Sequence, residues 1–188
     1  MNSNATRRAN LVALGACLFS PLPLLAAGQA VQLSPTIWQQ PRLIRVAFQH
    51  SSKNIAKEYL YWQNGQYIWP SYLLLSQMCL DINAQKAITM DPRLFDLMFV
   101  TQTWFYLLSG QITHHIITSA YRTELSNERV GGALHSQHLF GRALDGCMVG
   151  LDLASYAQML FAFKAGGVGL YRSHVHWDVG RSPRFWQA

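Results

Sequence analysis

Apolar and polar residues alternate with two different periods along the chain, and the change of period divides it into segments. A strand-like alternation over residues 43–48 predicts an edge strand, and two aromatic-rich strands follow on either side of Asn64-Gly65. Asn-Gly favours a tight hairpin turn because both residues tolerate a positive φ. The domain is therefore expected to begin with a strand and a hairpin.

A helical period replaces the alternation after the hairpin and predicts two helices. Pro70 opens the first, which runs to about Asn83 with apolar residues at helical spacing: Tyr72, Leu75, Cys79 and Ile82. Asp91 followed by Pro92 is a typical helix start, a capping acid before proline at the first helical position. The second helix is expected to end at Gly110.

The second half of the chain is richer in strand signals. Residues 114–120 and 143–149 are expected to be strands, 153–164 a helix, and the glycine cluster near residue 166 leads into a short strand and a last strand at 174–178. The pattern predicts an α+β fold, in which helices from the N-terminal half pack on a small, mostly antiparallel sheet. The candidate chemistry lies on the sheet half.

Composition favours one folded domain. The chain has 188 residues, of which 50% are hydrophobic and 13% charged, enough apolar residues for one core and too few charges for wholesale disorder. Its 15 basic residues against 9 acidic ones are scattered without a Lys/Arg-rich run, so no nucleic acid is expected as a partner.

The N-terminus has the features of an export signal over residues 1–30. Arg7 and Arg8 precede an apolar stretch at 11–25, and small residues follow it. The paired arginines favour a twin-arginine signal, with a Sec signal as the alternative. Pro21 and Pro23 interrupt the apolar stretch, which argues against a stable membrane-spanning helix. No stable membrane insertion is expected after signal removal, and an uncleaved membrane anchor is the alternative.

Export defines the expected compartment and domain boundaries. The protein is expected in the periplasm or cell envelope, with a linker at 31–42 and a single domain at 43–188. Cys17 is lost with the signal, and in an oxidising compartment Cys79 and Cys147 either pair or remain buried thiols.

Two imidazoles and a carboxylate at His138, Asp145 and His176 provide the nitrogen and oxygen donors that a hydrolytic zinc site needs. Because all ligands of one ion must meet in a small volume, the chain has to turn back between His138 and Asp145. Gly141 can adopt the backbone angles of such a turn.

The segment from 174 to 178 alternates polar and apolar residues. A period of two places His174, His176 and Asp178 on one face of a strand and Val175 and Trp177 on the other. The polar face is expected to line a water-filled cleft. The remaining histidines are expected to be surface or hydrogen-bonded core residues (His50, His114 and His115) or a residue at the rim of the site (His135).

From Arg42 to Trp186 the sequence resembles the murein endopeptidase K family of M15-type zinc peptidases, which are related to the D-alanyl-D-alanine metallopeptidases. The resemblance is carried by Y-W-Q-N-G-Q-Y (61–67), D-P-R-L-F-D-L (91–97), I-T-S-A-Y-R-T (117–123), S-Q-H-L-F-G-R-A-L-D (136–145), G-G-V-G-L-Y (166–171), V-H-W-D-V-G-R (175–181) and the terminal R-F-W.

The resemblance implies that His138, Asp145 and His176 bind one Zn²⁺ per chain. It also implies an enzyme that hydrolyses peptide cross-links of peptidoglycan, so that peptide stems are its partners. Arg122 falls where related enzymes place an arginine that faces the substrate, and a surface salt bridge is its alternative role.

The chain departs from the family in two places. The loop between Arg122 and His138 is shorter than usual, and His174 stands where many relatives have an aromatic residue. More distant zinc peptidases have a His-x-His pair here, whose first histidine works beside the metal, and this resemblance implies that His174 is the general base or an oxyanion stabiliser, with a structural role as the alternative. No glutamate occupies the E-x-x-H base position of other M15 members. Asp178 is expected to orient a histidine by accepting its other N–H.

Two rival functions fit the same residues. One is a D-alanyl carboxypeptidase or dipeptidase that uses the same zinc chemistry. The other is a non-catalytic envelope protein that binds muropeptides in the same groove.

Overall fold

The computed structural model describes residues 34–51 and 55–188, and the expected export signal lies outside these residues. A 3-10 helix, η1 (Pro35–Gln39), occupies part of the expected linker and is capped by the Ser34 hydroxyl, which accepts the Thr36 N–H. Ordered structure therefore begins before residue 43. Among the described helices, none has the length and apolar character that crossing a bilayer requires.

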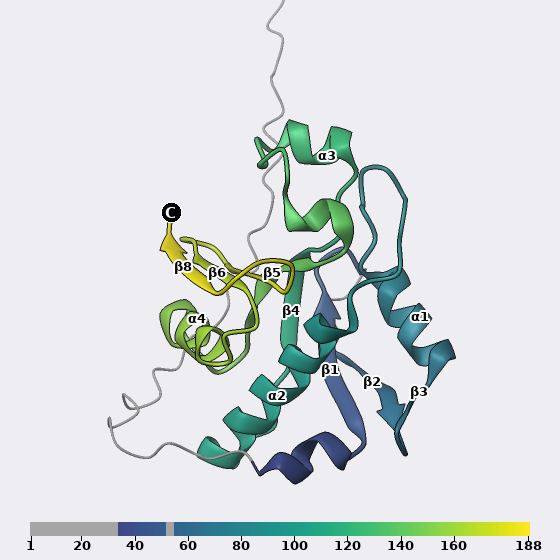
Figure 1. Cartoon of the computed structure of the whole chain (residues 1–188), viewed down its shortest axis with the longest axis vertical. Coiled ribbons are helices and arrows are strands. Elements are labelled where there is room, and N and C mark those ends of the chain that lie inside the picture. Colours follow the sequence, from purple (N-terminus) through teal and green to yellow (C-terminus); the bar gives the residue numbers. More distant parts are fainter. Residues whose placement is uncertain (1–33, 52–54) are drawn as a thin grey trace, which may run out of the picture.

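Within the described residues, eight strands form a single sheet in the order β3-β2-β1-β4-β5-β7-β6-β8 (Figure 1). In chain order they are β1 (Arg42–Phe48), β2 (Lys57–Gln63), β3 (Gln66–Tyr67), β4 (His115–Ser119), β5 (Ala143–Met148), β6 (Gly167–Leu170), β7 (Val175–Asp178) and β8 (Arg184–Gln187). Only the β1–β4 and β6–β8 pairs are parallel. The α+β class and the mostly antiparallel sheet are confirmed, but the sheet is larger than expected because both halves of the chain contribute strands.

Two strand predictions are wrong in position. The strand at 43–48 lies in the interior of the sheet, since β1 pairs with β2 on one side and with β4 on the other. The strand at 174–178 is not the last one, because β8 follows it and pairs with β6. The first error concerns pairing of β1 with β4, a segment far away in the sequence, and the second concerns a short strand that follows β7 directly.

The predicted hairpin is confirmed. Asn64 and Gly65 have φ values of 52° and 79° and connect β2 to β3. The second helix, α2 (Pro92–Ser109), also begins and ends as expected: the Asp91 carboxylate accepts the Arg93 N–H, and Gly110 is left-handed.

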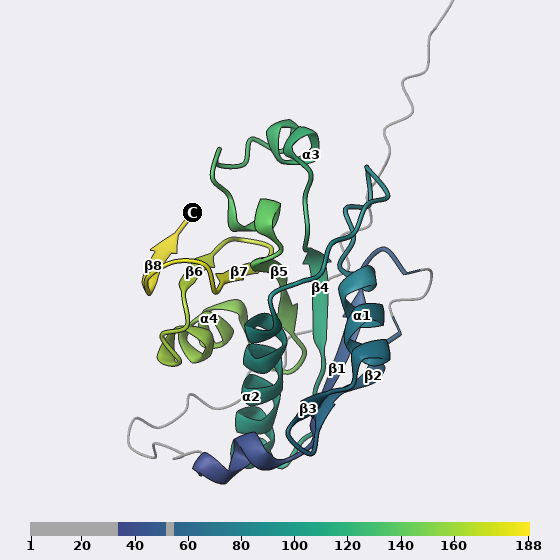
Figure 2. The ribbon, with the colours of Figure 1, turned by 45° about the vertical axis from the view of Figure 1, so that its right-hand side comes forward.

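Three helices cover one face of the sheet (Figure 2): α1 (Trp69–Met78), α2 and α4 (Leu153–Ala162). Their aromatic side chains pack edge to face in the core, where Tyr72 meets Phe95 and Tyr156 meets Trp177. The short helices α3 (Glu124–Arg129) and η2 (Gln137–Phe140) lie between β4 and β5 in the chain. A helix in the C-terminal half thus joins the two from the N-terminal half.

Helix α1 ends about five residues earlier than expected. The Asp81 carboxylate accepts the N–H groups of Asn83, Ala84 and Thr123 and so turns the chain toward α3. Ile82, which the helical spacing placed on the apolar face, is 45% exposed as a result.

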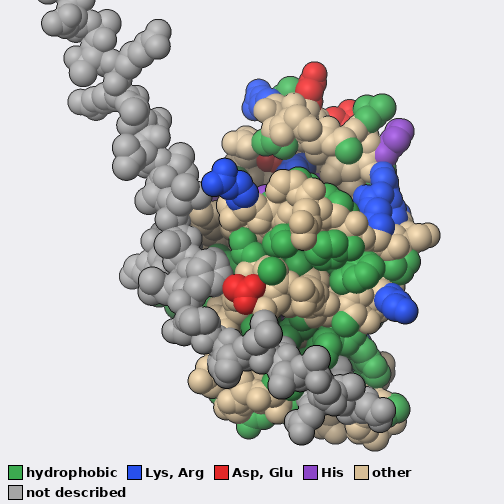
Figure 3. All heavy atoms as spheres, turned by 90° about the vertical axis from the view of Figure 1, so that its left-hand side faces the viewer, with side chains coloured by type: hydrophobic (Ala, Val, Ile, Leu, Met, Phe, Trp, Pro, Cys, Tyr) green, Lys and Arg blue, Asp and Glu red, His purple; other side chains and the backbone are tan. Residues whose placement is uncertain are grey.

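Cys79 is a buried free thiol, so the possible disulfide with Cys147 is not formed. On the side of the molecule that carries α4 and β8, apolar side chains gather across the middle, and Lys and Arg side chains lie apart around them (Figure 3).

Candidate metal centre

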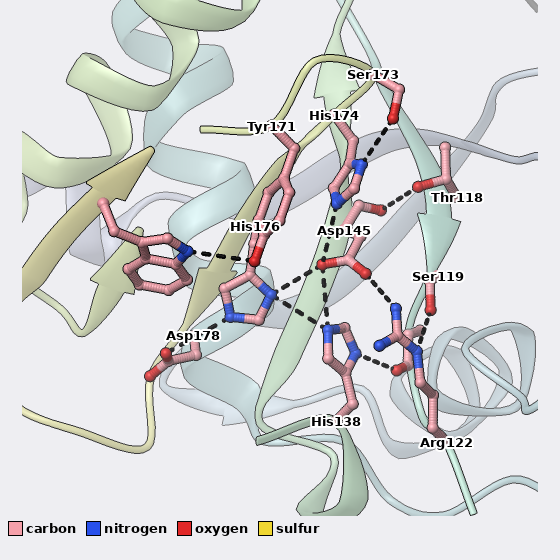
Figure 4. A network of polar contacts seen from close by, with 12 residues as sticks. Thr118, Ser119, Arg122, His138, Asp145, Tyr171, Ser173, His174, His176 and Asp178 are labelled. Carbon is pink, nitrogen blue, oxygen red and sulfur yellow. Dashed lines mark hydrogen bonds and ion pairs between the residues drawn. The ribbon is translucent and has the colours of Figure 1, made fainter. Parts of the chain in front are cut away.

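The three predicted ligands come together at one point (Figure 4). Asp145 on β5 and His176 on β7 are register partners in neighbouring strands, and His138 reaches them from η2. Asp145 Oδ1 lies 2.8 Å from His176 Nδ1 and 3.1 Å from His138 Nε2, and the two nitrogens are 3.2 Å apart. The side chains converge although 38 residues separate the two histidines.

Gly141 makes the turn that the spacing between His138 and Asp145 requires. It ends η2 in the left-handed region, with a φ of 63°, and its N–H donates to the His138 carbonyl. Residues other than glycine are strained at this φ. The chain then enters β5 with Asp145 pointing back toward His138.

Each imidazole has a polar contact on its far side, a hydrogen bond at His138 and a longer contact with a carboxylate at His176. His138 Nδ1 lies 2.5 Å from the Ala120 carbonyl oxygen and must donate to it, which leaves a lone pair on Nε2. His176 Nε2 lies 3.6 Å from Asp178 Oδ2, so its Nδ1 is the inward atom. This contact is longer than a hydrogen bond, and the orienting role of Asp178 stays a prediction.

The donor set fits a divalent cation such as zinc. Two lone pairs and a carboxylate oxygen that face one another repel unless a positive charge lies between them. Tetrahedral ligands about 2.1 Å from zinc are roughly 3.4 Å apart, close to the separations of 2.8–3.2 Å found here. His138, Asp145 and His176 would hold the ion, and the cleft beside them provides room for substrate.

The electrostatics of the centre favour the protonation states that a metal needs. Burial lowers the pKa of His138, and the Asp145 charge offsets this shift only in part. Burial would raise the pKa of Asp145, but His138 and His176 outweigh it and hold the pKa well below its usual value. His176 differs: burial opposes its charged form, yet Asp145 and Asp178 together raise its pKa. Protons therefore compete with a metal ion at His176.

Arg122 lies in the cleft, but its guanidinium is engaged (Figure 4). Nη2 donates to Asp145 Oδ2, and Nε donates to Ser119 Oγ over 2.9 Å. These contacts hold the second oxygen of Asp145 and leave Oδ1 facing the histidines. The expected role of Arg122 toward the substrate stays a prediction.

His174 lies just before β7 at the edge of the centre. Its Nε2 is 4.0 Å from Asp145 Oδ1, its Nδ1 is 3.0 Å from Ser173 Oγ, and its ring stacks on Tyr171 with a 7° interplanar angle. Burial lowers the pKa of His174, so the imidazole is held in the neutral form that can accept a proton. Its role as the base stays a prediction.

A cleft of about 430 Å³ opens over the centre, and part of its wall was not predicted. The indole of Trp186 on β8 lies 5.4 Å from the His176 ring and donates to the Tyr171 hydroxyl. A Cβ on Gly169 would come within 2.5 Å of this indole, so the glycine makes room for it. The alternating glycines of β6, Gly167 and Gly169, were the sequence feature from which an aromatic ring packed on that strand could have been predicted.

Among the histidines expected outside the site, His115 is a hydrogen-bonded core residue as expected, whereas His50 and His114 are half-buried and His50 Nε2 has no hydrogen-bond partner among the described residues. His115 is completely buried between Met98 and Tyr156, and neither His50 nor His114 lines the cleft. His135 lines its rim. Arg181 and Arg184 also line the cleft; both belong to motifs that carry the family resemblance, but no role was predicted for either from the sequence.

Comparison with known proteins adds independent information. Residues 36–186 match the family model described as Peptidoglycan L,D-endopeptidase MepK. The chain is 29% identical over 193 residues to the Peptidoglycan L,D-endopeptidase MepK of Escherichia coli K12, with 99% of this chain and 100% of that protein covered. The protein of the same name from Shigella flexneri matches equally well. No solved structure is significantly similar to the chain.

Proposed function

The chain belongs to the Peptidoglycan L,D-endopeptidase MepK family and is a peptidoglycan peptidase, and we propose that it uses one Zn²⁺ to hydrolyse peptide cross-links of murein in the cell envelope. The observation that carries the proposal is the convergence of His138 Nε2, Asp145 Oδ1 and His176 Nδ1 on one point beside a cleft. When bound there, zinc supplies Lewis-acid activation of water and of the scissile carbonyl.

The residues around the centre have distinct roles in this proposal. His174 accepts the proton of the attacking water at Nε2 and returns it to the leaving amine, as general acid–base catalysis requires. Its neutral imidazole and its position 4.0 Å from Asp145 support this role. Asp178 keeps His176 in the tautomer whose Nδ1 faces inward.

Arg122 acts from the opposite side of Asp145. Its guanidinium has five N–H donors, and the contacts with Asp145 and Ser119 use two of them. The remaining donors are available to the tetrahedral intermediate or to a substrate carboxylate. The side chain is 21% exposed, which leaves it accessible from the cleft.

Cross-linked murein lies outside the cytoplasmic membrane, so this substrate requires export. The predicted signal at residues 1–30 supplies the route, and we place the protein in the periplasm or cell envelope. Peptide stems are its partners, and neither a nucleic acid nor a stable membrane insertion has a role.

The decisive experiment is digestion of purified cross-linked murein by the protein, with and without a chelator. Fragments should appear with zinc and disappear when it is removed. His138→Ala and His176→Ala should each abolish zinc binding and lower the activity more than about a hundredfold. This is a larger effect than the 10–100-fold loss that is typical when a residue that only hydrogen-bonds to a metal ligand is replaced. His114→Ala, which removes an imidazole away from the cleft, is the matched control and should keep both.

The products separate the rival functions. Endopeptidase action converts dimers to monomers, whereas a carboxypeptidase releases a terminal residue and leaves dimers intact. A protein that binds muropeptides without releasing any fragment would be the non-catalytic alternative. Hydrolysis that persists in metal-free protein would rule out the zinc mechanism.

A further inference from the structure

A second concave surface adjoins the catalytic cleft, and four arginines line it. This surface, the arginine trough, is formed by Arg93, Arg142, Arg181 and Arg184 together with the small residues of the β7–β8 connection, and its volume is about 800 Å³. It lies where the first turn of α2, the residue before β5 and that connection meet. The start of α2 is tied to this region because the Asp91 N–H donates to the Gly141 carbonyl.

The positive charge of the trough is only partly neutralised. Asp91 pairs with Arg93 through two short contacts and lies 4.0 Å from Arg142. Within residues 34–51 and 55–188, no other carboxylate pairs with any of the four guanidinium groups. Four cations and one anion leave a net charge of about +3, which attracts anions into a concave surface.

The guanidinium groups remain accessible although neighbouring groups hold them. The side chains of Arg93 and Arg142 are 59% and 50% exposed. Arg181 donates to the His135 carbonyl, and Arg184 lies 5.0 Å from the centre of the Trp186 ring. Each contact orients a planar donor group without using up its N–H donors, which is the arrangement that suits carboxylates.

The trough is continuous with the catalytic cleft. Arg181 and Arg184 line both, and the Trp186 indole lies 5.0 Å from the Arg184 guanidinium and 5.4 Å from the ring of His176. A peptide whose scissile amide lies at the metal centre would therefore place its next residues among the four arginines.

We infer that the arginine trough is a substrate subsite that binds the free carboxylates of one peptide stem of a cross-linked dimer. The inference rests on the proposed function, because it takes the substrate from there and adds which part of this chain recognises its charge. Arg142 and Arg184 bind the carboxylates at the far and near ends of the trough, and Arg181 orients the stem where the two surfaces meet.

The test is equilibrium binding to the purified protein, from which the metal has been removed so that no substrate is cleaved. The two ligands are a cross-linked muropeptide dimer with free carboxylates and the same dimer after amidation. The acidic dimer should bind at least about tenfold more tightly, since hydrogen bonds to charged groups contribute more than neutral ones. Arg142→Gln and Arg184→Gln should each remove most of this difference and leave the affinity for the amidated dimer within about twofold.

Two further variants separate charge recognition from damage to the fold. Arg129→Gln removes the same charge at the exposed end of α3, outside both surfaces, and should bind both dimers as the unmodified protein does. Arg142→Lys keeps the charge and should retain the acidic dimer within about threefold. Equal affinity of the unmodified protein for both dimers, or equal losses for both in the Gln variants, would overturn the inference.

The same titrations distinguish whether the trough binds carboxylates or phosphates. If polyphosphate binds in an Arg142-dependent way while the acidic dimer does not, the trough recognises phosphates and the inference is wrong. A separate cleavage assay with zinc judges the proposed function. If the protein cleaves both dimers with the same KM, the proposed function is supported and the inference of a carboxylate subsite is wrong.

Discussion

At the residue scale, the centre depends on one hydrogen bond and one longer carboxylate contact beside its two imidazoles. The Ala120 carbonyl fixes the proton of His138 on Nδ1, and the Asp178 carboxylate faces His176 Nε2. Opposite nitrogens of the two rings therefore point inward, Nε2 from η2 and Nδ1 from β7. Such partners usually matter almost as much as the ligands themselves because they set both the tautomer and the ring orientation.

Asp178→Asn tests this control of the tautomer. An amide that presents its NH₂ to His176 Nε2 favours a proton on Nδ1, the atom that has to bind the metal. We expect apparent zinc affinity to fall about 10–100-fold, measured by competition with a chelator of known affinity, while the circular dichroism spectrum is retained. An unchanged affinity would mean that strand packing alone orients His176.

At the element scale, strand β4 carries a buried, hydrogen-bonded histidine on the helix-covered face of the sheet, whereas β5 and β7 carry two of the proposed ligands. His115 on β4 lies on the helix-covered face, where Nε2 donates to the Met98 carbonyl over 3.1 Å and Nδ1 accepts from the Tyr156 hydroxyl over 3.0 Å. Both nitrogens of a neutral imidazole are thereby satisfied between α2 and α4. Burial lowers the pKa of His115 to about 4.

This buried histidine predicts a stability change with pH. Because the pKa of His115 is about 4 in the folded protein and about 6.5 in the unfolded chain, only the unfolded chain takes up this proton between these values. Its contribution to the free energy of unfolding is complete above pH 6.5 and falls by on the order of 2 kcal/mol as the pH drops toward 4.5.

His115→Phe isolates this contribution. The variant should lose about 1–3 kcal/mol at pH 7.5, because Tyr156 and the Met98 carbonyl lose their partner, and its stability should change less between pH 7.5 and 4.5. Urea unfolding at the two pH values measures both effects. Parallel stability–pH curves for the variant and the unmodified protein would contradict the assignment.

At the scale of the whole molecule, the hydrophobic core and the candidate site occupy different parts of the eight-stranded sheet. Helices α1, α2 and α4 bury one face, while the proposed ligands and the cleft belong to β5, β7 and the segments next to them. The C-terminal strand β8 completes the cleft with Trp186 and the trough with Arg184. Segments from residue 93 to residue 186 therefore meet in a single functional surface.

Because three distant segments share one centre, metal binding should stabilise the entire fold. At a free zinc concentration 100-fold above the dissociation constant, linkage contributes about 2.7 kcal/mol, which corresponds to a rise in Tm of about 5–10 °C for a domain of this size. The rise should shrink as the pH falls, since protons compete at His176. His176→Ala should show no rise, and an equal rise in that variant would place the bound ion elsewhere.

Local features of the sequence were sufficient where near neighbours decide the structure. Asp91-Pro92 and Gly110 set the ends of α2, Asn64-Gly65 makes the hairpin, and the strand period places His176 and Trp177 on opposite faces. In these cases capping, allowed φ values and side-chain alternation act within a few residues. The helix end near Asn83 was missed because Asp81 turns the chain through a contact with Thr123, 42 residues away.

Residue type, periodicity and the order of motifs along the chain are enough to predict the fold class, the candidate donor set and the family. The interior position of β1 and the pairing of β8 with β6 become visible only in the folded molecule. The tertiary structure also decided which imidazole nitrogens face the centre, that Arg122 pairs with Asp145, and that arginines from four segments line one trough. Strand pairing and side-chain orientation depend on packing between segments up to about ninety residues apart. The free energy of that packing cannot be inferred from a local sequence pattern.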